Sequence, residues 1–205
     1  MLHLSTIDPS TLELLRKLMN IAEFSNLRLV GGTSLALQIG HRKSIDIDLF
    51  GNVDFETLDL PKLFAWSRNV NSISRSKNIN IFSIDNVKVD FVNYSYPWLG
   101  DVLNYEGIRL ASINDIAAMK LAAITGRGSR KDFIDLYFLL QKFTLKEILK
   151  MYSSKYFDGS EYLVLKSLTY FEDAEKDADT DMIADASWKE VKLKLLEIVK
   201  EYSLK

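Results

Sequence analysis

The segment GGTSLALQIGHRKSIDIDLF, from Gly31 to Phe50, carries the clearest structural signal in this chain. A glycine pair opens a run of small and aliphatic residues that is typical of a buried helix, and an alternating strand follows. Because successive side chains of a strand point to opposite faces, Asp46 and Asp48 stand side by side on one face. Two like charges this close need a compensating partner.

The composition indicates a globular protein. The chain has 205 residues, 47% hydrophobic and 26% charged, which suits one large core or two smaller lobes. The formal net charge of −2 gives no general attraction to nucleic acid or anionic membrane, so such contact needs a local basic patch. Cysteine is absent, which excludes disulfides, thiolate nucleophiles and cysteine-ligated zinc, and two histidines leave little room for a histidine metal site.

The N-terminus has no basic region followed by a long apolar run. No stretch approaches about 18 uninterrupted apolar residues, the length that a membrane helix needs. We therefore expect a cytoplasmic protein without a membrane partner.

The hydrophobic pattern of the first hundred residues predicts a mixture of helices and strands. Asp85-Asn86 separates two apolar segments and predicts an antiparallel hairpin there. The expected elements are a helix at 11–24, a strand at 27–30, a helix at 33–39, a strand at 44–50, a helix at 55–66 with a break or new first turn at Pro61, and strands at 79–84 and 87–92.

From Ser112 onward the pattern is wholly helical. Ser112 can cap a helix that ends at Gly126, and a second helix is expected at 130–141. Two capping boxes predict two more helix starts, one at Thr144 with Glu147 and one at Ser187 with Glu190. The predicted fold class is α/β, with a mixed sheet and helices in an N-terminal domain, 1–100, followed by an α-helical domain, 101–205.

The glycine pair is a candidate phosphate site. Glycine lets the backbone approach a ligand, and the first N–H groups of a helix point outward toward anions. We expect Gly31, Gly32, Thr33 and Ser34 to contribute to this site. A site for anions beside two carboxylates fits a nucleoside triphosphate bound with Mg²⁺ or Mn²⁺. The alternative is a half-exposed strand whose polar face only meets water.

A third carboxylate comes from the hairpin. In VKVDFVNY, Asp90 is an acidic residue within an apolar strand, where an unpaired buried charge would be costly. If this strand lies beside the first one, Asp90 joins Asp46 and Asp48. The alternative is an exposed position on an edge strand.

The helical half holds a second group of candidates. Lys120 falls within an Ala- and Leu-rich helix, and a basic loop follows it. Cations there would offset the charge of a departing pyrophosphate. The alternatives are a snorkelling lysine and ion pairing at a helix N-terminus. The candidates after Lys120 are Arg127, Arg130, Asp132 and Asp135.

The acidic run Asp177, Asp179 and Asp181 suggests calcium, but the spacing argues against it. An EF-hand needs a glycine after the third ligand and a glutamate at the twelfth position, where this chain has Met182 and Trp188. We interpret the run as a solvated loop between helices.

Taken together, these residues resemble the nucleotidyltransferase superfamily, which combines a glycine pair that opens a helix, a D-x-D motif and a third acidic residue. The chain resembles more closely the AbiEii/AbiGii family of type IV toxin-like nucleotidyltransferases. That resemblance rests on GGTSLAL at 31–37, on R-x-S-x-D-x-D from Arg42 to Asp48, on MKLAAITGRGSRKDFIDLYFLL at 119–140 and on LTYFEDAE at 168–175. Thirteen residues separate Gly32 from Asp46, which is more than in the superfamily's compact pattern but fits this family.

The resemblance implies a nucleotidyltransferase-type sheet and the Mg²⁺-dependent transfer of a nucleotide from an NTP. It also implies RNA as a candidate acceptor and an antitoxin as a candidate partner, within a toxin-antitoxin or phage-defence system. The resemblance matches Gly32, Thr33 and Ser34 to the motif that contacts phosphate. It matches Asp46 and Asp48 to the motif that binds metal, and Lys120 to the family's lysine on the first helix of the C-terminal half. Either Asp132 or Asp135 matches the acidic motif downstream.

We therefore expect a metal-dependent nucleotidyltransferase with catalytic residues Asp46, Asp48, Asp90 and Lys120. Asp90 completes the metal site or acts as a base toward the acceptor hydroxyl. Small molecules such as aminoglycosides and a protein hydroxyl stay open as acceptors beside RNA. The alternative function is a non-catalytic module that binds NTP or an antitoxin.

Overall fold

The computed structural model describes residues 1–204; Lys205, the last residue of the predicted helical domain, lies outside them. The chain forms two compact units from interleaved segments. The sheet unit comprises Met1–Ile39, Ser44–Ser95 and Val102–Ala111, and the helical unit comprises Gly40–Lys43, Tyr96–Asp101 and the chain from Ser112 onward. The predicted domain boundary after residue 100 lies within one of these interleaved segments.

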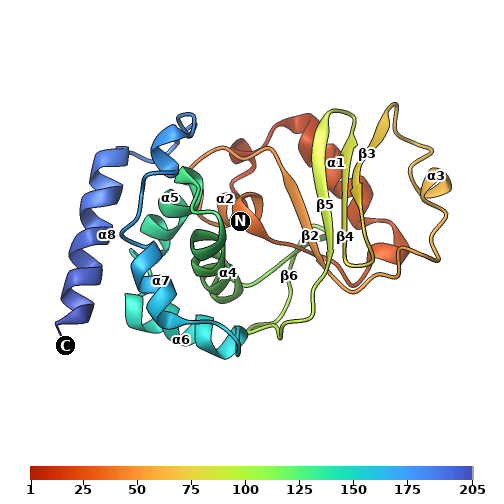
Figure 1. Ribbon diagram of the computed structural model, residues 1–205. Helices are drawn as coiled ribbons and strands as arrows, with labels where there is room; N and C mark the ends of the chain where they lie inside the picture. Colours follow the sequence, from red (N-terminus) through yellow and green to blue (C-terminus); the bar gives the residue numbers. More distant parts are fainter. Residues whose placement is uncertain (205) are drawn as a thin grey trace. The chain divides into compact units, whose positions relative to one another are not determined.

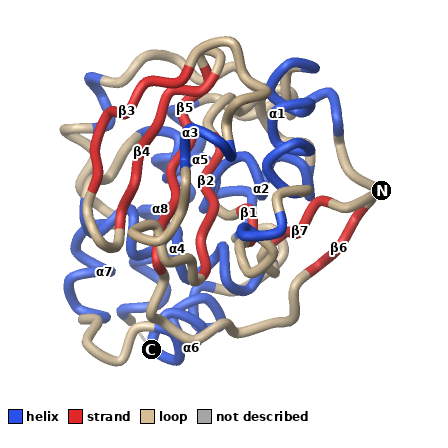
Figure 2. Tube along the Cα trace, turned by 90° about the vertical axis from the view of Figure 1, so that its right-hand side faces the viewer, coloured by secondary structure: helices blue, strands red, loops and turns tan. Residues whose placement is uncertain are grey.

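Within residues 1–204, the strands form a mixed seven-stranded sheet in the order β3-β4-β5-β2-β1-β7-β6 (Figure 2). β2 pairs in parallel with β5 and antiparallel with β1, and the hairpin of β4 and β5 extends the sheet toward β3. The strands are β1 (Arg28–Leu29), β2 (Ile47–Gly51), β3 (Val70–Arg75), β4 (Ile79–Ile84), β5 (Val87–Asn93), β6 (Leu103–Tyr105) and β7 (Ile108–Leu110).

The β4–β5 hairpin confirms the prediction from the sequence. Its turn residues Asp85 and Asn86 have φ values of 49° and 69°, as a two-residue type I′ turn requires. The neighbouring strand β3 was not predicted. All six of its side chains are exposed, so its sequence has no alternation of apolar and polar residues. The pairing of β3 with β4 shifts register between Ser72 and Ser74, which is a β-bulge or a similar irregularity.

The helices of the sheet unit are α1 (Pro9–Met19), α2 (Gly31–Ile39) and α3 (Leu60–Leu63), with 3₁₀ turns η1 (Leu4–Thr6) and η2 (Ala22–Phe24) (Figure 1). The helix predicted at 55–66 is reduced to α3. Pro61 lies in its first turn, and the Asp59 side chain accepts a hydrogen bond from the Lys62 amide at 3.3 Å. Pro61 therefore starts a short helix and does not interrupt a long one.

The core of the sheet unit lies against one face of the sheet. Side chains of β2 and β5 alternate, so that Leu49 and Phe91 are buried while Asp48 and Asp90 point to the opposite face. Phe24 closes this core with its ring centroid 4.9 Å from that of Phe91. Burial of one face thus fixes the direction of the carboxylates on the other.

The helical unit contains α4 (Ile113–Gly126), α5 (Arg130–Leu139), α6 (Leu145–Lys155), α7 (Glu161–Ser167), α8 (Trp188–Ser203) and the 3₁₀ turn η3 (Ala174–Lys176) (Figure 1). The predicted helix starts are confirmed. Ser112 caps α4, and both capping boxes are formed, at Thr144 with Glu147 and at Ser187 with Glu190. No helix in the described part of the chain is long and apolar enough to cross a membrane.

One buried ion pair fastens the segment Tyr96–Asp101 within the helical unit. Lys155 Nζ lies 2.7 Å from Asp115 Oδ1 and also donates to the Pro97 carbonyl at 2.7 Å. Neither of the two charged side chains is exposed to solvent. Asp115 also accepts hydrogen bonds from the amides of Leu99 and Gly100. This pair joins α4 and α6.

Candidate active site

Gly31 begins α2 in a conformation that other residues adopt with difficulty. Its φ is +67°, in the left-handed region. A Cβ atom at this position would overlap the Asp48 carboxylate. The neighbouring Val30 amide donates to the Asp48 carbonyl at 2.9 Å. The glycine therefore allows the start of α2 and the carboxylate of Asp48 to lie in contact.

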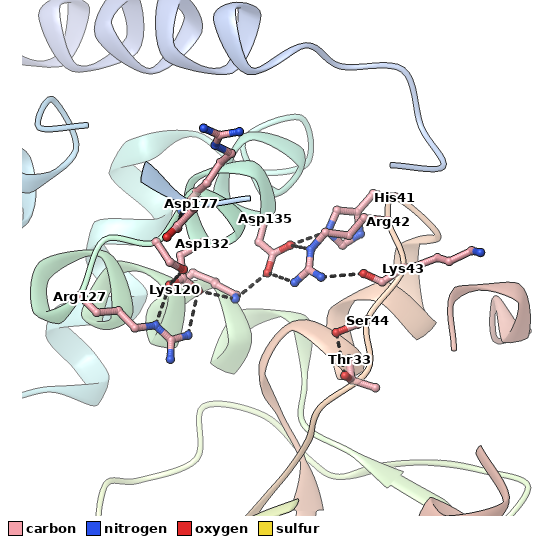
Figure 3. Close-up of polar contacts among 12 residues, drawn as sticks. Thr33, His41, Arg42, Lys43, Ser44, Lys120, Arg127, Asp132, Asp135 and Asp177 are labelled. Atoms are coloured by element: carbon pink, nitrogen blue, oxygen red, sulfur yellow. Dashed lines mark hydrogen bonds and ion pairs between the residues drawn. The ribbon is translucent and has the colours of Figure 1, made fainter. Parts of the chain in front are cut away.

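The hydroxyl groups of Thr33 and Ser34, the next polar residues of α2, form hydrogen bonds within the protein. Thr33 is 1% exposed, and its Oγ1 donates to the Asp46 carbonyl and accepts from the Ser44 hydroxyl, which lies 2.8 Å away (Figure 3). Ser34 is fully buried, and its Oγ accepts from Gln38 Nε2 at 3.1 Å. Thr33 thus ties the backbone of Asp46 to α2, while contacts of the Thr33 and Ser34 hydroxyls to phosphate stay a prediction.

Two of the three predicted metal ligands are brought together by strand pairing. β5 lies beside β2, and Asp90 is directly opposite Asp48 in the parallel register. Asp46 precedes β2 by one residue. Lys88, which shares the face of Asp90, places its Nζ 2.6 Å from both carboxylate oxygens of Asp90. The Asp90 side chain is 19% exposed and that of Lys88 is 45% exposed.

This pair of carboxylates fits a magnesium ion by its chemistry. Proteins hold Mg²⁺ through one or two carboxylates, while water and substrate phosphates complete the coordination. Across residues 1–204, no cluster of three or more His, Cys, Asp or Glu side chains has the arrangement of a metal site. The fit therefore rests on Asp48 and Asp90, and the participation of Asp46 stays a prediction.

The helical unit gathers another set of predicted residues into a buried ion network (Figure 3). Lys120 Nζ lies 2.9 Å from Asp132 Oδ1 and 2.5 Å from Asp135 Oδ2. The Lys120 side chain is 5% exposed and both aspartates are fully buried. Arg127 donates to Asp132 through Nε at 2.9 Å and Nη2 at 3.2 Å, and Ser129 Oγ donates to Asp132 at 2.6 Å.

Two residues that were not predicted as site residues complete this network. Arg42 donates to Asp135 through Nε at 2.6 Å and Nη2 at 2.9 Å, and His41 Nε2 lies 2.6 Å from Asp135 Oδ1. Arg42 is 3% exposed and His41 is 1% exposed. The sequence signal for Arg42 was its place at the start of R-x-S-x-D-x-D. We use the term buried ion network for His41, Arg42, Lys120, Arg127, Asp132 and Asp135.

The cations of the network keep its carboxylates ionised. Burial alone would raise the pKa of Asp135, but Lys120 and Arg42 outweigh it and hold that pKa well below its usual range. The pKa of Asp132 is lowered in the same way against the effect of burial, chiefly by Lys120 and Arg127. Burial would lower the pKa of Lys120, but the two aspartates raise it.

His41 stays neutral within the network. Burial lowers its pKa, and this effect exceeds the opposing hydrogen bond to Asp135. Because the ionised Asp135 can only accept, the proton of the neutral ring lies on Nε2. The other ring nitrogen, Nδ1, is buried and has no hydrogen-bond partner among the described residues.

Arg130, the other arginine predicted for the site, is not part of the buried ion network. It contacts the loop that contains Asp177 and Asp179. Its Nε donates to the Ala174 carbonyl at 3.1 Å, and its NH1 lies 2.5 Å from Asp179 Oδ1. The Arg130 amide donates to Asp177 Oδ2 at 2.7 Å. The acidic run is a solvent-exposed loop, as predicted, and Asp177 and Asp179 also bind Arg130.

The fold is that of known nucleotidyltransferases. MenT4, a nucleotidyltransferase toxin from Mycobacterium tuberculosis H37Rv, superposes with a TM-score of 0.62 at 14% identity, over 93% of this chain and 82% of that one. JHP933 from Helicobacter pylori superposes with a TM-score of 0.58 at 19% identity, over 95% of this chain and 92% of that one. These similarities show that the fold is shared.

The chain belongs to the family described as "Nucleotidyl transferase AbiEii toxin, Type IV TA system", whose model matches residues 13–75 and 61–201. The protein aq_aa25 of Aquifex aeolicus strain VF5, described as uncharacterized, is 37% identical over 196 residues, which are 93% of this chain and 94% of that protein. The family resemblance inferred from the sequence motifs is therefore confirmed.

Replacement of Gly31 by alanine tests the contact with Asp48. We expect Gly31→Ala to lose about 2 kcal/mol or more of unfolding free energy in urea, since a left-handed φ alone costs about 1–2 kcal/mol and the Asp48 carboxylate must also move. Gly107→Ala is the matched control, because Gly107 has φ +83° but no atom within 4 Å of an added Cβ. Equal losses in the two variants would show that the contact is unimportant.

Protonation of His41 makes stability depend on pH. Its folded-state pKa is lowered, so the unfolded chain takes up the proton first. The contribution of neutral His41 to the free energy of unfolding is complete above about pH 6.5. Below that pH the free energy of unfolding declines by at most about 1.4 kcal/mol per pH unit. Asp132 and Asp135 do not contribute in this window, because carboxylates with lowered pKa values lose their stabilisation only below about pH 4.

The measurement is the unfolding free energy of wild type and His41→Gln between pH 8 and pH 5. We expect the difference between the two proteins to shrink or reverse as the pH falls. His3→Gln, at the exposed second histidine, is the control and should follow the wild type. A constant difference between wild type and His41→Gln would contradict the assignment of a neutral, buried His41.

Proposed function

We propose that this protein transfers a nucleotide from a nucleoside triphosphate to an acceptor, with a divalent cation held by Asp48 and Asp90 and completed by Asp46. One observation carries the proposal. Asp48 and Asp90 lie directly opposite each other on parallel strands, on the face of the sheet away from the core. Gly31 places the start of α2 against the same Asp48 carboxylate.

The chemistry follows from these neighbours. When held by Asp48 and Asp90, Mg²⁺ or Mn²⁺ would supply positive charge to the phosphates and would lower the barrier to displacement of pyrophosphate. The first amides of α2, from Gly31 to Thr33, bind the triphosphate, because helix N-termini attract anions. The Ser34 amide donates to the Val30 carbonyl at 3.3 Å and does not belong to this set. We propose Asp90 as a ligand in preference to a base toward the acceptor hydroxyl, because it lies directly opposite Asp48.

In the helical unit, we propose Arg127 as the cation that meets the triphosphate. Its side chain is 65% exposed, so a ligand can reach it. Asp132 orients the guanidinium through Nε and NH2, and Lys120 in turn balances Asp132. Lys120 thus acts on the triphosphate through Arg127, because its own ammonium is almost wholly buried between two carboxylates.

We propose RNA as the acceptor and a cognate antitoxin as the partner, with the reaction in the cytoplasm, where nucleoside triphosphates are available. The support is the family description, which names a type IV toxin-antitoxin system, and the fold shared with a nucleotidyltransferase toxin. A phage-defence role fits the same support. Protein hydroxyls and small molecules, aminoglycosides among them, are the other acceptors to be tested.

Replacement of single carboxylates tests the reaction. Incubation with each α-labelled NTP, Mg²⁺, total RNA and lysate should label one acceptor, and the band identifies its class. We expect Asp48→Asn and Asp90→Asn to reduce labelling about 100-fold or more, because even residues that only support a metal ligand contribute 10–100-fold. Asp101→Asn, at an exposed aspartate in the helical unit, is the control and should label at the wild-type rate.

A non-catalytic module that binds NTP or an antitoxin is the competing function. It would show Mg-NTP binding in calorimetry without release of pyrophosphate for any acceptor tested. Equal labelling by wild type and Asp48→Asn would refute the metal assignment, whichever acceptor is found.

Lys88 should compete with the cation for Asp90. Its ammonium contacts both carboxylate oxygens, so Lys88→Met should bind Mn²⁺ more tightly in the absence of NTP. The gain is expected to be up to about fivefold, since a partly exposed ion pair contributes about 0.2–1 kcal/mol. Electron paramagnetic resonance of Mn²⁺ measures this, and Lys77→Met, at another exposed lysine of the sheet unit, should leave the affinity unchanged.

A further inference from the structure

The segment Gly40–Lys43 connects α2 to the stretch that contains Asp46 and Asp48, and it belongs to the helical unit. Asp135 binds its two central side chains. Arg42 meets the carboxylate through two nitrogens, at 2.6 and 2.9 Å, and His41 meets it through Nε2 at 2.6 Å. All three side chains are at most 4% exposed, so water does not compete for these bonds.

The backbone of the same segment is held from a second direction. The Lys43 amide donates to the Asp181 carbonyl at 2.8 Å, and the His41 carbonyl accepts from Ile183 and Ala184 at 3.0 and 2.9 Å. Arg42 forms an isolated antiparallel bridge with Met182. The segment is thus fixed by side-chain contacts to α5 and by main-chain contacts to residues 181–184.

Asp46 and Asp48, the proposed metal ligands, come shortly after this segment in the sequence. Asp46 is three residues beyond Lys43, a length of chain that spans about 10 Å when fully extended. Within the sheet unit, the Ser44 amide donates to the Thr6 carbonyl at 2.9 Å, and Thr33 Oγ1 binds the Asp46 carbonyl. Three residues of chain therefore connect a segment held within the helical unit to Asp46, which Thr33 holds within the sheet unit.

We infer that Asp135 is a positioning residue: through His41 and Arg42 it fixes the segment that leads into Asp46 and Asp48, and thereby sets the affinity of the site for its divalent cation. The inference rests on the proposed metal site. It gives a fully buried carboxylate of the network a role that does not require contact with NTP, since Arg42 and Lys120 already neutralise it.

An ion pair that only stabilises the fold could have the same geometry as the Arg42–Asp135 contact. A second buried ion pair in the chain allows the two roles to be compared. Lys155 and Asp115 form an equally buried pair in the same unit, with contacts to the segment Tyr96–Asp101 instead. Arg42→Met and Lys155→Met each remove one cation from a buried carboxylate. Both variants should lose stability, but only Arg42→Met should disturb the metal motif.

The experiment compares these variants in the full chain by Mn²⁺ binding without NTP and by amide hydrogen exchange of residues 44–50. We expect Arg42→Met to weaken Mn²⁺ binding about tenfold, the effect typical of residues that support metal ligands. Exchange at 44–50 should also become at least about tenfold faster. Lys155→Met should change either quantity by less than about twofold. Arg42→Lys, which keeps the charge but not the two-nitrogen contact, should fall between wild type and Arg42→Met.

Hydrogen exchange separates this inference from the proposed function. If wild type binds no Mn²⁺, the metal proposal and its affinity claim both fail, but exchange at 44–50 still tests the anchoring by Asp135. Equal exchange at 44–50 in Arg42→Met and Lys155→Met would overturn the inference, as would unchanged Mn²⁺ affinity in a folded Arg42→Met protein. If Arg42→Met does not fold, His41→Gln takes its place, and the same two measurements decide.

Discussion

A carboxylate without solvent exposure persists in a folded protein only when cations and donors surround it, and Asp135 is such a group. Removal of a charge from water costs several kcal/mol, and the penalty is offset only by close, well-oriented partners. Arg42 provides two parallel N–H donors, which is the strongest geometry available to a carboxylate. The His41 to Asp135 bond spans 94 positions of sequence, so a single side chain fastens two distant parts of the chain.

The sheet unit follows a different constraint, the burial of one face only. Ile47 and Leu49 must lie in the core, and the alternation of the strand then directs Asp48 to the other side. Parallel pairing with β5 repeats this arrangement with Val89, Phe91 and Asp90. The position of the candidate ligands is therefore a result of hydrophobic packing, because the carboxylates contribute nothing to the core that orients them.

Local signals in the sequence predicted the elements that depend on local chemistry. The Asp85-Asn86 turn, the Ser112 cap and the two capping boxes each depend on residues within four positions of one another, and all were correct. The strand β3 was missed because its side chains are exposed on an edge, which leaves no hydrophobic period. The helix expected at 55–66 was too long, because Pro61 has no N–H to donate within a helix and lies instead in the first turn of a short one, which Asp59 caps.

The candidate site also has features that the sequence predicted and features that it did not. The D-x-D alternation and the glycine junction were readable, because strand geometry and helix chemistry act over a few residues. The partnership of His41 and Arg42 with Asp135 was not readable, because no local pattern specifies a contact across more than ninety positions. The motif containing Arg42 marked the residue as part of the resemblance without indicating its partner.

The outer edge of β3 also bears on how the protein behaves in concentrated solution. An edge strand with open backbone groups is a template for pairing with a second chain, which leads to aggregation. Here the register shift between Ser72 and Ser74 breaks the even spacing of those groups, and Arg75 ends the strand with a charge. A second chain that pairs edge to edge with β3 would have to accommodate both the irregular spacing and the charge, and each disfavours the continuous ladder that a fibril needs.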